Sequence, residues 1–180
     1  MKKMTKAEAK GLGTARQYAA LPFRKLGKNK TEVLLITSRE TRRWVVPKGW
    51  PMKNKTGQET AEIEAFEEAG VAGVLWHRAL GSFGYLKQRV GKFPIACEVE
   101  LYPLEVTEEL SAWPEQDERE RKWFTPSQAA KLVHEPELKA LLRTFGAKKS
   151  IKAREPMGYP RGLTRLAAQR AGKLFDRIGI

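Results

Sequence analysis

The sequence predicts an α/β (α+β) fold in which a mixed β-sheet carries helices on both faces. Short apolar segments rich in β-branched residues occur before and after one central helical segment, and two further helical segments follow. Strands on both sides of a helix in the chain favour a sheet that buries its faces under helices. The chain has 180 residues, of which 41% are hydrophobic, and this suits one compact domain with additional residues at its ends.

The expected strands are set by their composition and by alternation of apolar and polar residues. Glu32–Thr37 and Arg43–Pro47 are the first two, and Lys48–Lys55 is expected to be a loop because it contains Gly, Pro and Asn. Val74–Leu86 predicts one or two strands, and Phe93–Leu104 predicts a longer one. An acidic loop at 107–120 then leads to a short strand at Arg121–Thr125.

The central helix is expected from Gly57 to Ala69. Thr56 and Glu59 have the spacing of a capping box, in which each side chain satisfies the other residue's backbone amide. Gly70 follows as the C-terminal stop. Pro126–Val133 and Pro136–Phe145 are expected to be helices that begin with proline, which the first turn tolerates.

Composition excludes several kinds of site. Cys97 is the single cysteine, so no intrachain disulfide and no thiolate zinc site is expected. His77 and His134 are the two histidines and lie far apart, which argues against histidine-based zinc chemistry and a Ser/His triad. No apolar run reaches the length of a membrane span, and we expect a cytoplasmic protein.

The net charge of +13 is concentrated at the ends of the chain. Residues 1–16 hold five Lys or Arg and one acid, and residues 146–180 hold nine and two, which leaves +2 for 17–145. We therefore expect a basic N-terminal extension, a domain at 17–145 and a basic C-terminal extension in which 162–180 suits an amphipathic helix. Basic ends favour polyanions such as RNA without specificity, and they also solubilise.

The central helix carries clustered carboxylates. Glu64, Glu67 and Glu68 share one side at helical spacing, and Thr56–Val71 contains no Lys or Arg to offset them. A bound Mg²⁺ or Mn²⁺ would offset this repulsion, because hard cations take carboxylate oxygens. An alternative is a solvated acidic face. Six cations lie between positions 39 and 55, upstream of the helix, and could neutralise the remaining charge of a phosphate; they are Arg39, Arg42, Arg43, Lys48, Lys53 and Lys55.

The stretch from Gly49 to Val71 resembles the Nudix box, G-x5-E-x7-R-E-U-x-E-E-x-G-U, where U is aliphatic. The residues that match are Gly49, Glu64, Ala65, Glu67, Glu68, Gly70 and Val71. Together with Ser38–Pro47 and Lys122–Phe124, this stretch resembles the diphosphoinositol polyphosphate phosphohydrolase branch of the Nudix hydrolase superfamily over residues 17–145. The resemblance implies a Nudix-type α/β/α sandwich and a metal-dependent phosphoanhydride hydrolase.

Two positions depart from the box. Lys55 stands where the box has its first glutamate, and Ile63 stands where it has arginine. The resemblance implies that this arginine orients a catalytic glutamate, so Ile63 predicts reduced or lost activity. Lys55 removes an acid and adds a cation, which suits a more anionic substrate.

The resemblance assigns roles to the matching residues. Glu64 and Glu68 are expected to bind Mg²⁺ or Mn²⁺, and Glu67 is expected to accept a proton, although it also suits metal binding while another acid serves as base. A further acid is expected from the 115–120 loop, with Glu118 and Glu120 as candidates. The phosphates are expected to contact Ser38, Arg39, Arg42, Arg43, Lys48 and the Gly49 backbone.

Three functions remain open from the sequence. The first is hydrolysis of a small polyphosphate, either a dinucleoside polyphosphate or a diphosphoinositol polyphosphate. The second is hydrolysis at RNA 5′ ends with the basic extensions on the backbone, which salt would weaken steeply. The third is a non-catalytic domain that binds a phosphate ligand. The sequence leaves the oligomeric state open.

Overall fold

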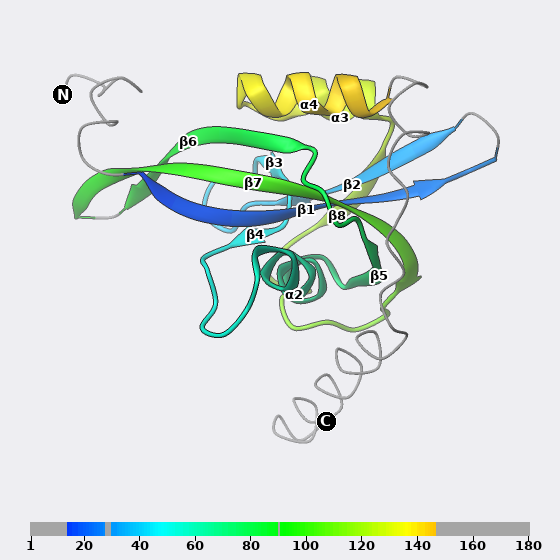
Figure 1. Ribbon diagram of the computed structural model, residues 1–180, viewed down its shortest axis with the longest axis horizontal. Coiled ribbons are helices and arrows are strands. Elements are labelled where there is room, and N and C mark those ends of the chain that lie inside the picture. Colours follow the sequence, from blue (N-terminus) through cyan, green and yellow to red (C-terminus); the bar gives the residue numbers. More distant parts are fainter. Residues whose placement is uncertain (1–13, 28–29, 90, 147–180) are drawn as a thin grey trace.

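The computed structural model describes residues 14–27, 30–89 and 91–146. Residues 1–13 of the basic N-terminal extension predicted at 1–16, most of the C-terminal extension and the predicted helix at 162–180 lie outside the described residues. Eight strands form one sheet, flanked by helices on both faces. The predicted α/β/α arrangement is confirmed (Figure 1).

The sheet is mixed. Its main path runs in the order β3 (Trp44–Val45), β2 (Thr31–Thr37), β1 (Ala15–Lys25), β7 (Lys92–Glu109) and β5 (Val71–Leu75). Strands β1 and β7 pair in parallel from Ala15 opposite Cys97 to Phe23 opposite Glu105, and the other pairings are antiparallel. The remaining strands lie off this path: β4 (Lys48–Gly49) pairs with β1, β6 (Gly81–Arg89) with β7, and β8 (Arg121–Phe124) with β2.

Strand β1 was not predicted, although it lies at the centre of the sheet. Its residues alternate between two buried faces: Ala19, Leu21 and Phe23 belong to one core cluster, and Ala20 belongs to the other. A strand covered on both faces has a nearly continuous apolar run without the polar alternation of a half-exposed strand. The Ala-rich composition and Pro22 weaken the remaining strand signal.

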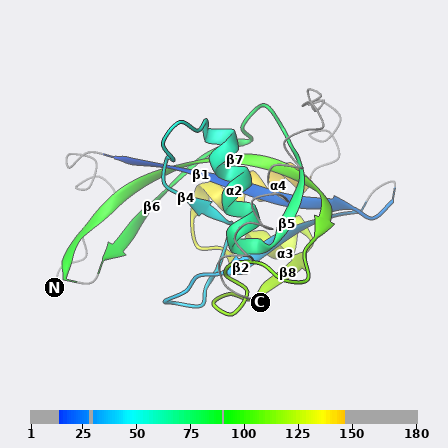
Figure 2. The ribbon, with the colours of Figure 1, turned by 90° about the horizontal axis from the view of Figure 1, so that it is seen from below.

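The helices divide the core into two layers. Helix α2 (Gly57–Ala69) covers one face, where Ala61, Ala65 and Ala69 are fully buried. Helices α3 (Pro126–Leu132) and α4 (Pro136–Gly146) cover the other face (Figures 1 and 2). Among the described residues, no helix has the length and apolar character needed to cross a membrane.

Most element boundaries agree with the expectation within a few residues, and two predictions were wrong. The acidic loop expected at 107–120 begins later, because β7 continues to Glu109. The segment Lys48–Lys55 was expected to be a loop throughout, but Lys48–Gly49 forms β4 and pairs with Tyr18 and Ala19 of β1. The pairing fixes the backbone of Gly49 to the sheet directly before α2. This short strand therefore sets the position of the glycine against the helix.

Candidate metal and polyphosphate site

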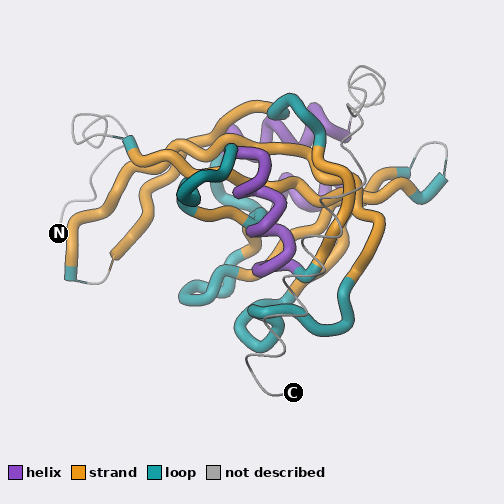
Figure 3. The backbone as a smooth tube through the Cα atoms, turned by 60° about the horizontal axis from the view of Figure 1, so that its bottom comes forward, coloured by secondary structure: helices purple, strands orange, loops and turns teal. Residues whose placement is uncertain are grey.

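Helix α2 is held at both ends by the predicted caps. The Thr56 amide donates to Glu59 Oε2 at 2.8 Å, and the Glu59 amide donates to Thr56 Oγ1 at 3.2 Å. Gly70 ends the helix at φ 61°, in the left-handed region that favours glycine. Figure 3 shows α2 against the sheet with loops gathered at its ends.

Glu68 is the most enclosed acid of the helix, with 6% of its surface exposed. Its Oε2 accepts a hydrogen bond from the Lys48 amide at 2.9 Å, and its Oε1 accepts one from Arg119 Nη2. Burial raises the pKa of Glu68, whereas the charges of Lys48 and Arg119 lower it. Glu68 thus connects α2 to β4 and to the loop that precedes β8.

Glu64 lies directly against Gly49. A Cβ added to Gly49 would be 1.7 Å from Glu64 Oε1, so any other residue at position 49 would require the Glu64 carboxylate to move. Burial, followed by the charges of Glu68 and Glu67, raises the pKa of Glu64 to about 7. The Gly49 backbone therefore lies against a glutamate, and its contact with the phosphates of a substrate stays a prediction.

Glu67 faces an acid from outside the helix. The Glu115 amide donates to the Glu67 carbonyl oxygen at 3.2 Å, which docks the 110–120 loop on α2. Burial raises the pKa of Glu67, and the charges of Glu115 and Glu68 raise it further. Glu115 also raises the pKa of Glu64 and of Glu68. Four carboxylates from α2 and this loop therefore repel one another.

Of the acids in the 115–120 loop, Glu115 rather than the candidates Glu118 and Glu120 lies beside the helix carboxylates. Glu118 and Glu120 point to arginines instead: Arg39 Nη1 lies 3.2 Å from Glu118 Oε2, and Arg42 Nη2 lies 2.5 Å from Glu120 Oε1. Glu115, three residues before Glu118, faces the helix carboxylates. Side-chain direction in an irregular loop depends on its docking contacts, which spacing in the sequence does not reveal.

The donor chemistry of this cluster fits a divalent cation. Carboxylate oxygens are the ligands that Mg²⁺ and Mn²⁺ prefer, and partly buried, mutually repelling carboxylates gain from a cation between them. Each oxygen of Glu68 accepts one hydrogen bond, and each has a second lone pair. Over residues 14–27, 30–89 and 91–146, no three acidic, histidine or cysteine side chains are already grouped as a metal site.

Four of the predicted phosphate-binding residues, Ser38, Arg39, Arg42 and Arg43, lie between β2 and β3, and the other two, Lys48 and Gly49, form β4. Ser38 Oγ accepts from the Arg43 amide at 3.2 Å, and Arg42 adopts φ 52°. Arg43 Nη1 lies 3.3 Å from Glu135 Oε1. Arg39 and Arg42 pair with the exposed loop acids, so all three arginines of the turn already have carboxylate partners.

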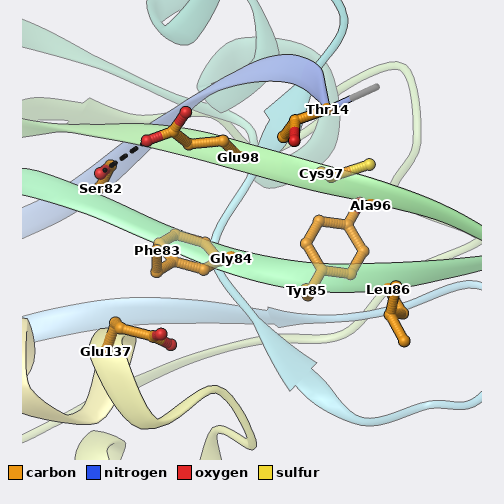
Figure 4. Close-up of a pocket in the computed structure, with 10 residues that line it drawn as sticks. All are labelled: Thr14, Ser82, Phe83, Gly84, Tyr85, Leu86, Ala96, Cys97, Glu98 and Glu137. Atoms are coloured by element: carbon orange, nitrogen blue, oxygen red, sulfur yellow. Dashed lines mark hydrogen bonds between the residues drawn. The ribbon is translucent and has the colours of Figure 1, made fainter. Parts of the chain in front are cut away.

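Lys48 links the carboxylate cluster to a pocket. Its amide contacts Glu68, and its Nζ lies 5.9 Å from the centroid of the Tyr85 ring. Burial lowers the pKa of Lys48, and the charge of Glu68 raises it. Tyr85 in turn lines a cavity of about 480 Å³ on β6 and β7 (Figure 4).

The pocket is lined by both apolar and polar side chains. Phe83 and Tyr85 come from β6, and Ser82 Oγ donates to Glu98 Oε1 of β7 at 3.3 Å. Tyr85 Oη donates to Gln17 Oε1 at 2.6 Å, which fixes the ring. The remaining lining residues are Thr14, Gly84, Leu86, Ala96, Cys97 and Glu137.

Arg119 and Glu115 are the site residues that the sequence did not reveal. Arg119 is 7% exposed, and it bonds Glu68 of α2 and Glu115 of its own loop. In the sequence both belong to a charged run, Glu115–Lys122, that is typical of a solvated loop. The absence of any cation from α2 was the available signal that one must come from elsewhere.

Comparison with known proteins identifies the family. A family model described as the NUDIX domain matches residues 16–145. Nudix hydrolase 13, mitochondrial, of Arabidopsis thaliana is 36% identical over 122 residues, which are 65% of this chain and 60% of that protein. Diphosphoinositol polyphosphate phosphohydrolase 3-beta of Bos taurus is 36% identical over 129 residues, 69% of this chain and 73% of that protein.

A solved structure shares the architecture. The structure of a C. elegans Ap4A hydrolase binary complex has a TM-score of 0.56 and 25% identity, and it covers 73% of this chain and 95% of that one. The residues that match the family model include both core clusters, residues from all eight strands of the sheet and the helix that carries the carboxylates. The chain therefore belongs to the Nudix family, whose members are hydrolases that act on phosphoanhydride bonds and generally use divalent metal ions.

Proposed function

We propose that this chain hydrolyses a phosphoanhydride bond of a small polyphosphate in the presence of Mg²⁺ or Mn²⁺. The observation that carries the proposal is the cluster of three partly buried helix acids, Glu64, Glu67 and Glu68, beside Glu115 of the docked loop, whose charge raises the pKa of all three. A structural role offers no reason to retain such repulsion. A cation bound between these acids and the substrate would reduce this repulsion.

The chain's own residues then take the following roles. Glu64 and Glu68 hold the metal, and Gly49 leaves the space that the Glu64 carboxylate occupies. Glu67 accepts the proton of the attacking water, which is the role that a carboxylate with a raised pKa performs well near neutral pH. When bound, the ion supplies Lewis-acid stabilisation of the charge that develops on the phosphates.

The cationic turn supplies the remaining charge for the phosphates. The pairs of Arg39 with Glu118 and of Arg42 with Glu120 are largely exposed, and such pairs contribute about 0–1 kcal/mol each. A polyphosphate that offers several charges can displace these partners at little cost. Arg43 and Lys48 lie deeper and complete the binding residues, with Ser38 holding the turn.

The pocket beside Lys48 favours a dinucleoside polyphosphate as substrate. A nucleoside has an apolar aromatic face for Phe83 and Tyr85, and a volume of about 480 Å³ lies in the range of small-molecule sites. Lys48 contacts both the carboxylate cluster and Tyr85, so phosphates and nucleoside would lie on opposite sides of one residue. A diphosphoinositol polyphosphate is the second candidate, favoured by the cationic turn and by the bovine relative.

Two earlier alternatives stay predictions. RNA 5′ ends as substrates depend on the basic extensions, which lie almost entirely outside the described residues. A non-catalytic ligand-binding role depends on Ile63, and the same activity measurements decide it. A cytoplasmic location also remains a proposal, and several Arabidopsis relatives carry the word mitochondrial in their names.

A substrate panel tests the proposal. We expect Mg²⁺-dependent release of a nucleotide from a dinucleoside polyphosphate at a higher kcat/KM than from nucleoside triphosphates, sugar nucleotides, inositol pyrophosphates or triphosphorylated RNA. Tyr85→Ala should raise KM for the dinucleoside substrate, and Tyr85→Phe, which keeps the ring, should not. A higher kcat/KM for inositol pyrophosphates together with no effect of Tyr85→Ala would overturn the substrate assignment. Binding without turnover for every compound of the panel would overturn the proposal that the chain is an enzyme.

A further inference from the structure

Arg119 is a buried cation in the middle of the acidic cluster. Its Nε donates to Glu115 Oε2 at 2.6 Å, its Nη1 donates to the Thr37 carbonyl oxygen at 3.0 Å, and its Nη2 donates to Glu68 Oε1. All three nitrogens are therefore engaged, and each has a different partner. Only 7% of the residue is exposed, so it is poorly placed to serve as a solubilising surface charge.

Helix α2 offers its acids no cation of its own. Thr56–Val71 contains neither Lys nor Arg, and position 63, where the Nudix box has arginine, holds the half-buried Ile63. Glu68 nevertheless lies in a nearly closed environment, and a buried carboxylate needs a charged partner. Arg119 provides that partner from the loop before β8, 51 residues away in the sequence.

We propose that Arg119 is the positioning residue of this hydrolase site and supplies, from the loop, the cation that the box arginine would otherwise provide. The guanidinium is planar and presents its N–H groups in a fixed fork, so its contacts with Thr37 and Glu115 fix the direction in which it meets Glu68. Glu68 is held between this fork and the Lys48 amide. The inference rests on the proposed function, because Glu68 is there a metal ligand.

Holding Glu68 in this way leaves it able to bind a metal. A carboxylate has about four lone-pair directions, and two hydrogen bonds leave two of them. A ligand whose rotamer is fixed before the metal arrives loses less entropy on binding, and partners of this kind typically contribute about 10–100-fold to metal affinity or activity. Loss of Arg119 should therefore affect metal binding and kcat rather than the affinity for substrate.

The experiment compares wild type with Arg119→Met, Arg119→Lys, Glu68→Gln and the double variant Arg119→Met/Glu68→Gln. Arg24→Met is the control, because Arg24 is also an ion-paired arginine but pairs with Glu32 and Glu109 away from the site. For each protein, Mn²⁺ affinity is measured by titration calorimetry. The values of kcat and KM are measured by steady-state hydrolysis of the dinucleoside substrate, and stability is measured by thermal unfolding. The Mn²⁺ titration needs no turnover, so it separates this proposal from failure of the proposed function.

We expect Arg119→Met to lower Mn²⁺ affinity and kcat by about 10–100-fold with little change in KM. Arg119→Lys should recover part of the loss because it returns the charge without the fork, and Arg24→Met should match wild type. The double variant should lose no more kcat than Glu68→Gln alone, because both substitutions act through one group.

Three results would overturn the proposal. Wild-type Mn²⁺ affinity in Arg119→Met would show that Glu68 needs no positioning. A rise in KM at unchanged kcat would make Arg119 a substrate-binding residue instead. Losses of kcat that multiply in the double variant would show that Arg119 acts independently of Glu68. If Arg119→Met fails to fold, Arg119→Lys and the double variant, which removes both charges of the Arg119–Glu68 pair, give the same comparison.

Discussion

Gly49 lies so close to Glu64 that a Cβ at position 49 would overlap Oε1 at a distance of 1.7 Å. Strand β4 fixes the backbone of the glycine by pairing it with Tyr18, and α2 fixes the backbone of Glu64, so the overlap can be relieved only by movement of the Glu64 carboxylate. This contact joins the first residue of the box, Gly49, to the first acid of the helix that matches the box, Glu64, by direct packing. A larger residue at position 49 would therefore change the position of the Glu64 carboxylate.

Gly49→Ala should displace the Glu64 carboxylate and lower kcat by about 100-fold, since a shift of about 1 Å in a reacting group can have that effect. The measurement is steady-state hydrolysis of the dinucleoside substrate at saturating Mg²⁺. Gly27→Ala is the control: Gly27 has φ 97° and nothing within 4 Å of an added Cβ, so it should lower stability and leave kcat unchanged. Equal kcat for Gly49→Ala and wild type would show that the contact does not position Glu64.

The pKa of Glu64 predicts how metal binding stabilises the protein at different pH. In the folded protein this pKa is about 7, above the ordinary value of 4.5, so the contribution to stability is present below pH 4.5 and is lost as pH rises through 7. A cation favours the charged carboxylate, so the Tm increase caused by Mn²⁺ should be larger at about pH 8 than at about pH 5.5.

Thermal unfolding with and without Mn²⁺ at both pH values measures this difference. Glu64→Gln cannot ionise, and it should reduce the pH dependence of the Mn²⁺ effect relative to wild type. An equal Tm increase at both pH values, or the same pH dependence in Glu64→Gln, would mean that Glu64 does not face the metal.

Glu115 should contribute to metal binding more than its neighbours in the same loop. Glu115→Gln removes a charge that acts on all three helix acids, and we expect Mn²⁺ affinity to fall by about 10-fold. Glu118→Gln is the matched control, because Glu118 is an exposed loop acid paired with Arg39. Titration calorimetry distinguishes them, and equal affinities in the two variants would argue that Glu115 is only a structural partner of Arg119.

Local patterns predicted the parts of the fold that local contacts determine. The Thr56–Glu59 capping box, the Gly70 stop and the helix acids depend on residues within a few positions of one another. The Pro126 and Pro136 helix starts are of the same kind. Where a short segment contains its own hydrogen-bonding partners, its sequence was sufficient to predict its secondary structure.

The parts that could not be predicted depend on contacts between distant segments. Strand β1 lacks polar alternation because both of its faces are buried, and β4 has two residues that are held by pairing with β1. Arg119 and Glu115 gain their roles only when the 110–120 loop docks on α2 through the Glu115 amide and the Glu67 carbonyl. Spacing along the chain carries no information about that docking.

The account depends most directly on Glu68 as a metal ligand. Hydrolysis of a dinucleoside polyphosphate should be measured over a Mg²⁺ titration for wild type, Glu68→Gln and Glu62→Gln; Glu62 is a half-buried acid of the same helix whose charged neighbours are Glu59 and Lys55. We predict that Glu68→Gln loses about 100-fold or more of the rate at saturating metal, and that Glu62→Gln retains it. A Glu68→Gln variant as fast as wild type under saturating metal would contradict the assignment of the site.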